Sequence, residues 1–254
     1  VFRLKAFEVP ASSLNAKGVA IVNLLQLQPE EQVRAVIRVN KQEESGNLFM
    51  CTVKGVVKKT KYDLYKNVRG SGIITIKLDP GDELRWIRFT MGENEIVITT
   101  AAGQAMRFHE KYVRPMGRAS RGVRGVRLRA DDNVVGMDIV REGVDLFVMS
   151  EKGFGKRTKV EQFTPHTRGG VGIRAAVVNE KTGRLVSVTA LDENAKELII
   201  ISAGGQTIRL QTKDIPQIGR ATQGVRVMRL KDNDRVASIA LVGESEIEEA
   251  EVKE

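Results

Sequence analysis

Short runs of β-branched and aliphatic residues alternate with Gly, Asn and Asp turns along the whole chain. Two typical runs cover residues 95–99 and 197–201, and each is followed within a few residues by a glycine. No ten-residue stretch has the 3.6-residue period of an amphipathic helix. Strands of four to six residues between such turns favour antiparallel hairpins, so the pattern predicts an all-β protein.

The pattern repeats about every 50 residues. The hairpin glycines that anchor the copies are Gly55, Gly103, Gly153 and Gly205. The earliest copy lacks this glycine and begins within a strand at 1–5, so we expect the chain to start inside a repeat. The repeats cover approximately 1–40, 46–90, 93–140, 143–190 and 195–243. Four-stranded units of this length are typical of propeller blades, whereas a helical solenoid, the weaker alternative, needs amphipathic helices.

A single blade cannot cover both of its faces, so five stacked blades, of an expected six, are predicted to form one domain over 1–243. Two further columns support this interpretation. A glycine followed by a β-branched residue, predicted to begin a strand, recurs at Gly18-Val19, Gly72-Ile73, Gly122-Val123, Gly170-Val171 and Gly224-Val225. Core positions facing inward are predicted at Val33, Leu84, Val134, Leu185 and Val236.

Charge is unevenly distributed. The chain carries +9 overall, but six glutamates and one lysine follow position 240. Residues 1–240 hold 40 basic and 26 acidic side chains and therefore carry +14. This body favours an anionic partner, and nucleic acid is the obvious one. The acidic segment 244–254 is expected to be disordered, and either to compete with DNA for the basic surface or to serve only as a solubilising tail.

Basic residues occupy one column of the repeat, four residues after the hairpin glycine. This basic column consists of Arg3, Lys59, Arg107, Arg157 and Arg209. Period-2 alternation in segments such as 105–108 predicts that the apolar neighbours pack and the basic side chain faces solvent. Further DNA-binding candidates cluster around the loop glycines: Lys17, Arg69, Arg118, Arg121, Arg124, Arg168, Arg174, Arg220 and Arg226. We expect both sets to border one rim.

Regularly spaced charge on a curved edge suits a long polyanion that bends over it. Aromatic residues make up only 5% of the chain and do not interleave with the basic column, which argues against single-strand stacking. No recognition helix is evident, so the sequence favours duplex DNA bound through its backbone. Two alternatives remain: a protein-interaction propeller whose basic rim binds an acidic partner, and an enzyme with polar residues converging in a central pocket.

Four segments, 21–25, 55–60, 122–128 and 153–158, resemble the C-terminal domain of the A subunit of bacterial DNA gyrase and the equivalent domain of topoisomerase IV. The resemblance covers nearly the whole chain. It implies a β-pinwheel, a propeller-like disc whose blades exchange strands, with DNA wrapped around the basic perimeter. In the whole enzyme the wrap presents DNA for strand passage and supercoiling.

The resemblance also implies a non-catalytic domain without a cofactor of its own, since ATP and Mg belong to the whole enzyme. The implied partners are double-stranded DNA, the breakage-reunion domain of the same polypeptide and the gyrase B subunit, in the bacterial cytoplasm. The gyrase-specific box of the form QRRGGKG is missing, and 117–123 and 167–172 are its nearest remnants. We expect the box to lie upstream of Val1, and the topoisomerase IV domain remains an alternative.

Other chemistry has little support in the sequence. Cys51 has no second cysteine to pair with, and His109 and His166 lack neighbouring ligands at metal-binding spacing. No apolar run approaches 18 residues, so no membrane span is expected.

Overall fold

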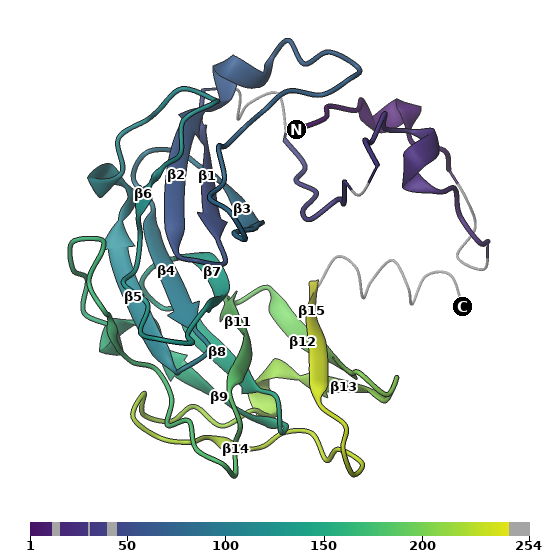
Figure 1. The fold of residues 1–254 in the computed structure, drawn as a ribbon. Helices are drawn as coiled ribbons and strands as arrows, with labels where there is room; N and C mark the ends of the chain where they lie inside the picture. The colour runs from purple at the N-terminus through teal and green to yellow at the C-terminus, as the bar shows by residue number, and fades with distance from the viewer. Residues whose placement is uncertain (12–15, 30, 40–44, 244–254) are drawn as a thin grey trace.

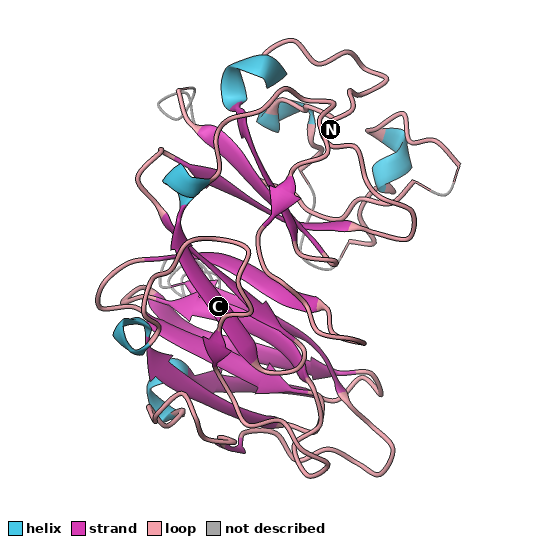
Figure 2. Cartoon of the chain, turned by 60° about the vertical axis from the view of Figure 1, so that its left-hand side comes forward, coloured by secondary structure: helices cyan, strands magenta, loops and turns pink. Residues whose placement is uncertain are grey.

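The computed structural model describes residues 1–11, 16–29, 31–39 and 45–243, and strands carry nearly all of its regular structure (Figure 2). The predicted disorder of 244–254 therefore lies outside the described residues. The first repeat contains two single-turn 3-10 helices, η1 (Ala6–Glu8) and η2 (Ile21–Asn23), and no strand among its described residues.

Four antiparallel sheets, named blades A to D, follow one another around an open arc (Figure 1). Blade A contains β1 (Asn47–Thr52), β2 (Val56–Lys61), β3 (Leu84–Thr90) and β6 (Val123–Arg124). Blade B contains β4 (Glu95–Thr100), β5 (Gln104–His109), β7 (Val134–Val140) and β10 (Ile173–Arg174). Blade C contains β8 (Asp145–Ser150), β9 (Phe154–Lys159), β11 (Leu185–Leu191) and β14 (Val225–Arg226), and blade D contains β12 (Ala195–Ser202), β13 (Thr207–Gln211) and β15 (Val236–Gly243). The all-β prediction with four-stranded units is confirmed.

The outermost strand of blades A, B and C comes from the following repeat. After β5 the chain crosses back to blade A, where β6 pairs with β2; β10 pairs with β5 and β14 with β9 in the same way. The single turns η4 (Tyr62–Tyr65), η5 (Glu110–Tyr112), η6 (Val160–Gln162) and η7 (Thr212–Asp214) follow the second hairpin strand of each blade. The third, fourth and fifth repeats thus each donate one strand to the preceding blade, as the resemblance implied.

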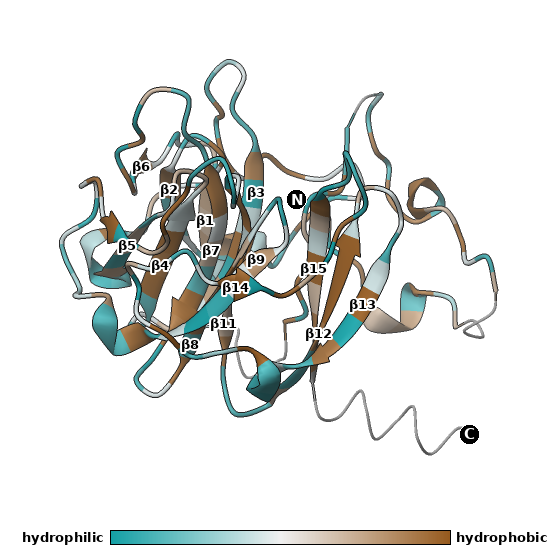
Figure 3. Cartoon of the chain, turned by 90° about the horizontal axis from the view of Figure 1, so that it is seen from below, coloured by the Kyte–Doolittle hydropathy of each residue, from teal (hydrophilic) through white to brown (hydrophobic). Residues whose placement is uncertain are grey.

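The core lies between the blades. On β1, Phe49 and Cys51 pack against blade B, while Leu48 and Met50 pack on the opposite face. On β8, Leu146 faces one neighbouring blade and Phe147 the other. Alternate residues of each first hairpin strand are therefore buried on opposite faces, which is why these strands are nearly continuous apolar runs (Figure 3).

The inner strands β3, β7, β11 and β15 face the centre of the arc (Figure 1). Asp138 of β7 connects three of them: Arg88 Nε of β3 lies 2.8 Å from Asp138 Oδ1 in an ion pair, and Asp138 Oδ2 accepts the backbone N–H of Ala190 of β11 at 3.0 Å. Of the predicted core positions, Val134, Leu185 and Val236 are buried and Leu84 is half-buried. The prediction for Val33 is wrong, because the first repeat contributes no blade here that could cover it and the residue is 40% exposed.

Positive backbone φ marks the glycine that precedes each exchanged strand. Gly122 has φ +99° and Gly172 has φ +81°, and a Cβ on Gly172 would lie 2.4 Å from Ala105 O. Only glycine permits this close approach to β5. The fourth member of the glycine column is therefore Gly172, followed by Ile173; the assignment to Gly170 and Val171 is wrong by two residues.

The same geometry recurs between Val1 of the first repeat and Ile73 of the second. Val1 donates its terminal N–H to Ile73 O at 2.8 Å, and Ile73 donates its N–H to Val1 O at 3.0 Å. Ile73 follows Gly72 as Val123 follows Gly122, so residues 72–74 lie against the first repeat as β6 lies against β2.

Candidate nucleic-acid interface

The three middle members of the basic column, Lys59, Arg107 and Arg157, join neighbouring blades. Lys59 is only 5% exposed, and its ammonium lies 3.3 Å from Glu110 Oε2 and donates to Glu110 O at 2.9 Å. Arg107 is 9% exposed; its guanidinium pairs with Glu95 at 3.1 Å and donates to Val160 O and Phe163 O. For these two residues the predicted outward orientation is wrong.

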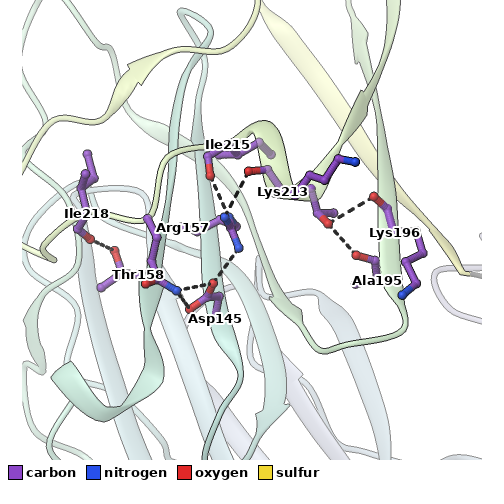
Figure 4. A network of polar contacts seen from close by, with 10 residues as sticks. Asp145, Arg157, Thr158, Ala195, Lys196, Lys213, Ile215 and Ile218 are labelled. Carbon is purple, nitrogen blue, oxygen red and sulfur yellow. Dashed lines mark hydrogen bonds and ion pairs between the residues drawn. The ribbon is translucent and has the colours of Figure 1, made fainter.

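Arg157 repeats this arrangement between blades C and D (Figure 4). Its Nη1 pairs with Asp145 Oδ2 of the same hairpin at 2.9 Å, and its Nε donates to Ile215 O, just after η7, at 2.8 Å. The next residue, Thr158, donates its hydroxyl to Ile218 O at 2.9 Å. Arg107 and Arg157 therefore donate to carbonyls at a single-turn helix of the next blade, where the end of the turn leaves carbonyls that need donors.

The period-2 argument misplaced the column because it assumed that one face of each strand meets water. Between two blades the polar face is covered as well, and an arginine is tolerated there only with partners. The partners leave a signal in the sequence: an acidic residue stands twelve positions before the arginine at Glu95, Asp145 and Glu197.

The two ends of the column are more open. Arg209 pairs with Glu197 of its own hairpin, but no described blade follows, and its side chain is 55% exposed. Arg3 is exposed and donates to Lys66 O, just after η4, at 2.6 Å.

The exchanged strands carry a second column of basic residues. Arg124, Arg174 and Arg226 are the second residues of β6, β10 and β14, and all three are exposed. They stand in the same register, opposite Val56, Gln104 and Phe154 respectively. Since β6 and β14 lie on the outside of the arc (Figure 1), this column follows the outer perimeter.

Loop arginines connect successive members of that column. Arg168 donates to Arg124 O at 3.1 Å and to Tyr112 O at 2.9 Å, and Arg220 donates to Arg174 O at 3.2 Å. We call Arg118, Arg124, Arg168, Arg174, Arg220 and Arg226 the arginine belt. None of them forms an ion pair with a carboxylate in the described parts of the chain, so their positive charge is uncompensated.

The remaining candidates lie beside the belt or apart from it. Arg121 is exposed and pairs with Asp79. Arg69 is exposed in the corresponding loop of the second repeat, and Lys17 is exposed in the first repeat. Thus the belt arginines lie at the perimeter, whereas Lys59, Arg107 and Arg157 of the basic column lie in the interfaces between blades.

Two buried lysines were missed from the sequence. Lys58 and Lys156 stand three residues after the hairpin glycine and are 0% and 1% exposed. Lys58 Nζ donates to Thr75 O at 2.6 Å and to Arg118 O. Lys156 Nζ donates to Gly219 O, Arg220 O and Thr222 Oγ1 at 2.8, 2.7 and 3.1 Å.

Burial lowers the pKa of Lys58 to about 8, and burial together with the nearby Arg220 charge lowers the pKa of Lys156 to about 8. Adjacent basic residues in 55–60 and 153–158 were visible, but the pattern did not show that Lys58, Lys59 and Lys156 are buried.

Cys51 is buried, and its surroundings raise the pKa of the thiol well above the ordinary range, first through desolvation. Within the described ranges, no group of three His, Cys, Asp or Glu residues is placed to hold a metal ion. Nor does any helix in those ranges have the length and apolarity needed to cross a membrane.

Blades built around an antiparallel hairpin and closed by a strand from the next repeat define a strand-exchanged β-propeller. The model of one such family, described as the DNA gyrase C-terminal domain, β-propeller, matches residues 1–40, 46–90, 94–141, 145–192 and 196–242. The chain therefore belongs to the DNA gyrase A C-terminal domain family.

Individual relatives agree with this assignment. The chain is 37% identical to the DNA gyrase A subunit of Chlamydia pneumoniae over 96% of its length, and 39% identical to that of Staphylococcus aureus strain MRSA252 over 99%. It spans only 29% of the length of either relative.

Solved structures share the fold. The C-terminal domain of DNA topoisomerase IV superposes with a TM-score of 0.83 over 93% of this chain and 75% of that one. A DNA gyrase A C-terminal domain gives a TM-score of 0.79 over 89% of this chain and 75% of that one. Both are 24% identical in sequence to this chain.

Proposed function

We propose that the chain binds and bends duplex DNA along its outer perimeter, without regard to base sequence, through the arginine belt. The observation that carries this proposal is the common register of Arg124, Arg174 and Arg226 on three consecutive exchanged strands. A polyanion that follows the perimeter meets an equivalent cation at each blade, and each neutralised phosphate releases counterions.

The surroundings of the belt support a phosphate ligand. The guanidinium of Arg226 lies 5.3 Å from the centre of the Phe154 ring, which holds it without neutralising it. Arg168 and Arg220 use some of their donors on carbonyls of the neighbouring exchanged strand, which fixes their position. Arginines held in place by neutral groups keep their charge and their remaining donors for phosphate oxygens.

In a complete gyrase A subunit, the wrapped DNA would be presented to the breakage-reunion domain for strand passage. That step needs the B subunit, with its ATP and Mg, so this domain acts as a non-catalytic part of a type IIA topoisomerase. Joined to those parts without the missing box, the repeats are expected to support relaxation and decatenation better than negative supercoiling.

Charge removal on the perimeter tests the proposal. The variant with Arg124→Gln, Arg174→Gln and Arg226→Gln should bind a duplex more weakly, and the slope of log K against log salt should fall by about 3, since each lost phosphate contact removes about 0.9. The matched control replaces Arg85, Arg141 and Arg235, which lie on or beside the inner strands, with Gln. If the control loses as much affinity and slope as the perimeter variant, DNA does not follow the belt.

A further inference from the structure

In blades A and C a buried lysine holds the loop that carries a belt arginine. Blade B has no lysine at this place. Lys58 and Lys156 stand at the same place in their hairpins, and each ammonium donates to the backbone carbonyl of a loop arginine, Arg118 or Arg220. The equivalent residue of blade B is Met106, which is buried in an apolar cluster. A Cβ added to Gly170 in the loop above it would lie 2.8 Å from Met106 Cε, so apolar packing takes the place of the ammonium.

We infer that Lys58 and Lys156 are positioning residues for DNA binding, which fix the Arg118 and Arg220 loops at the perimeter through their carbonyls. This inference rests on the proposed function, because it assigns these lysines a role in the affinity of the belt for phosphate. Neither ammonium can reach DNA itself, since both side chains are buried.

The chemistry favours positioning over simple packing. Burying an ammonium costs free energy that a methionine would not cost, and blade B shows that the fold accepts methionine at this place. What the lysine adds is a set of directed donors: two carbonyls for Lys58, and two carbonyls and a hydroxyl for Lys156. A protonated amine has three donors and a neutral amine has two, so the Lys156 contacts require the charged form in full.

The groups around Lys58 and Lys156 determine the pH at which these lysines lose a proton and hold the loops less firmly. The ionisable groups close to Lys58 are Arg118 on the loop and Tyr65 on η4, whose hydroxyl hydrogen-bonds with Thr75; Lys156 faces Arg220. No carboxylate in the described part of the chain hydrogen-bonds to either ammonium. With a pKa of about 8, both lysines lose their proton just above neutral pH, while the arginines stay charged.

The test compares Lys58→Met with Lys156→Met and with both together, in the whole chain. Each variant should bind duplex DNA about three- to tenfold more weakly at pH 7, because an unanchored loop must be ordered on binding. Wild-type affinity should fall between pH 7 and pH 9 toward that of the double variant, whose own affinity should change little. Lys54→Met and Lys152→Met are the matched controls, since they remove the same charge from exposed positions of the same two hairpins, and their pH profile should follow the wild type.

Hydrogen exchange in the loops gives a readout that does not depend on DNA. Amides of residues 117–121 should exchange faster in Lys58→Met, and those of 219–223 in Lys156→Met, with the hairpin strands unchanged. Equal loop exchange together with an unchanged pH profile of affinity would overturn the inference. If the loops loosen but no form of the protein binds DNA in a salt-dependent way, the proposed function fails while the anchoring role stands.

Discussion

Arg107 illustrates how one side chain can stabilise two blades at once. It neutralises Glu95 within its own hairpin and donates to two carbonyls around η6 of the following blade. Removing it would leave the partly buried Glu95 carboxylate without its cation and would take one donor from each of the two carbonyls, and lost partners of buried polar groups carry a desolvation cost. The side chain therefore contributes mainly to the interface between blades B and C.

Arg107→Met should lower the free energy of unfolding by about 3 to 5 kcal/mol, the range for breaking a buried pair from one side. In a chain of this size that corresponds to a melting temperature lower by about 10 °C. Arg209→Met removes the equivalent residue of the last blade, which is 55% exposed, and should cost less than about 1 kcal/mol. Calorimetry of both variants measures the difference; equal, small losses would mean that Arg107 does not link the blades.

Stability should also depend on pH through Lys58 and Lys156. Their pKa is about 8 in the folded chain and near 10.5 in an unfolded one. Between these values the unfolded chain binds more protons, so the free energy of unfolding rises with pH from about 8 to 10.5. Burial raises the pKa of the Cys51 thiol, so this group makes the free energy of unfolding fall as pH rises. Because wild type and variant share Cys51, the difference between them reports the lysines alone. Urea denaturation at pH 7.5 and 9.5 should show a larger rise for the wild type than for Lys58→Met with Lys156→Met; parallel behaviour would contradict the lowered pKa values.

At the scale of single elements, the exchanged strand depends on the glycine before it. Gly172 combines a positive φ with backbone contact to Ala105, whereas Gly170 has no positive φ and faces only the flexible end of Met106. Gly172→Ala should therefore destabilise the chain by about 1 to 3 kcal/mol, the usual cost of a strained backbone position. Gly170→Ala is the control and should change stability by less than about 1 kcal/mol, since the Met106 side chain can move aside. Thermal melts of the two variants distinguish them, and a reversed order would restore Gly170 to the column.

The elements were predictable from sequence because hairpins and their turns depend on local spacing. Gly55, Gly103, Gly153 and Gly205 set the repeat without any knowledge of packing. The choice between Gly170 and Gly172 was not local: both precede a β-branched residue, and only the contact with β5 separates them. Likewise, alternation showed that the Arg107 side chain lies opposite its apolar neighbours, but not that another blade covers that face. Arg124, Arg174 and Arg226 were assigned to the rim as loop residues; their common register became visible only with the strand exchange.

At the scale of the whole molecule, the belt extends over three blades, so one straight contact cannot engage all of it. Bending a site of 20 to 30 base pairs by 40–90° costs about 1 to 6 kcal/mol, which phosphate contacts at successive blades can offset. Affinity per duplex should rise with duplex length until the DNA covers the belt. Fluorophores at the two ends of such a duplex should approach each other on binding, as measured by energy transfer. Unchanged transfer at saturation would show that the protein binds DNA without bending it.

Strand exchange also has a consequence for how genes of this kind can change length. The third and fourth repeats each donate an outer strand to the repeat before them and receive one from the repeat after them, through β6, β10 and β14. When one whole repeat is deleted or duplicated, the repeat that gives the outer strand and the repeat that receives it are again neighbours at the new junction. This holds wherever within the repeat the cut is made. Deleting half a repeat leaves one blade without its outer strand and its arginine. Recombination between repeats can therefore alter the number of blades in whole steps, and with it the length of the perimeter, while every interior interface is kept.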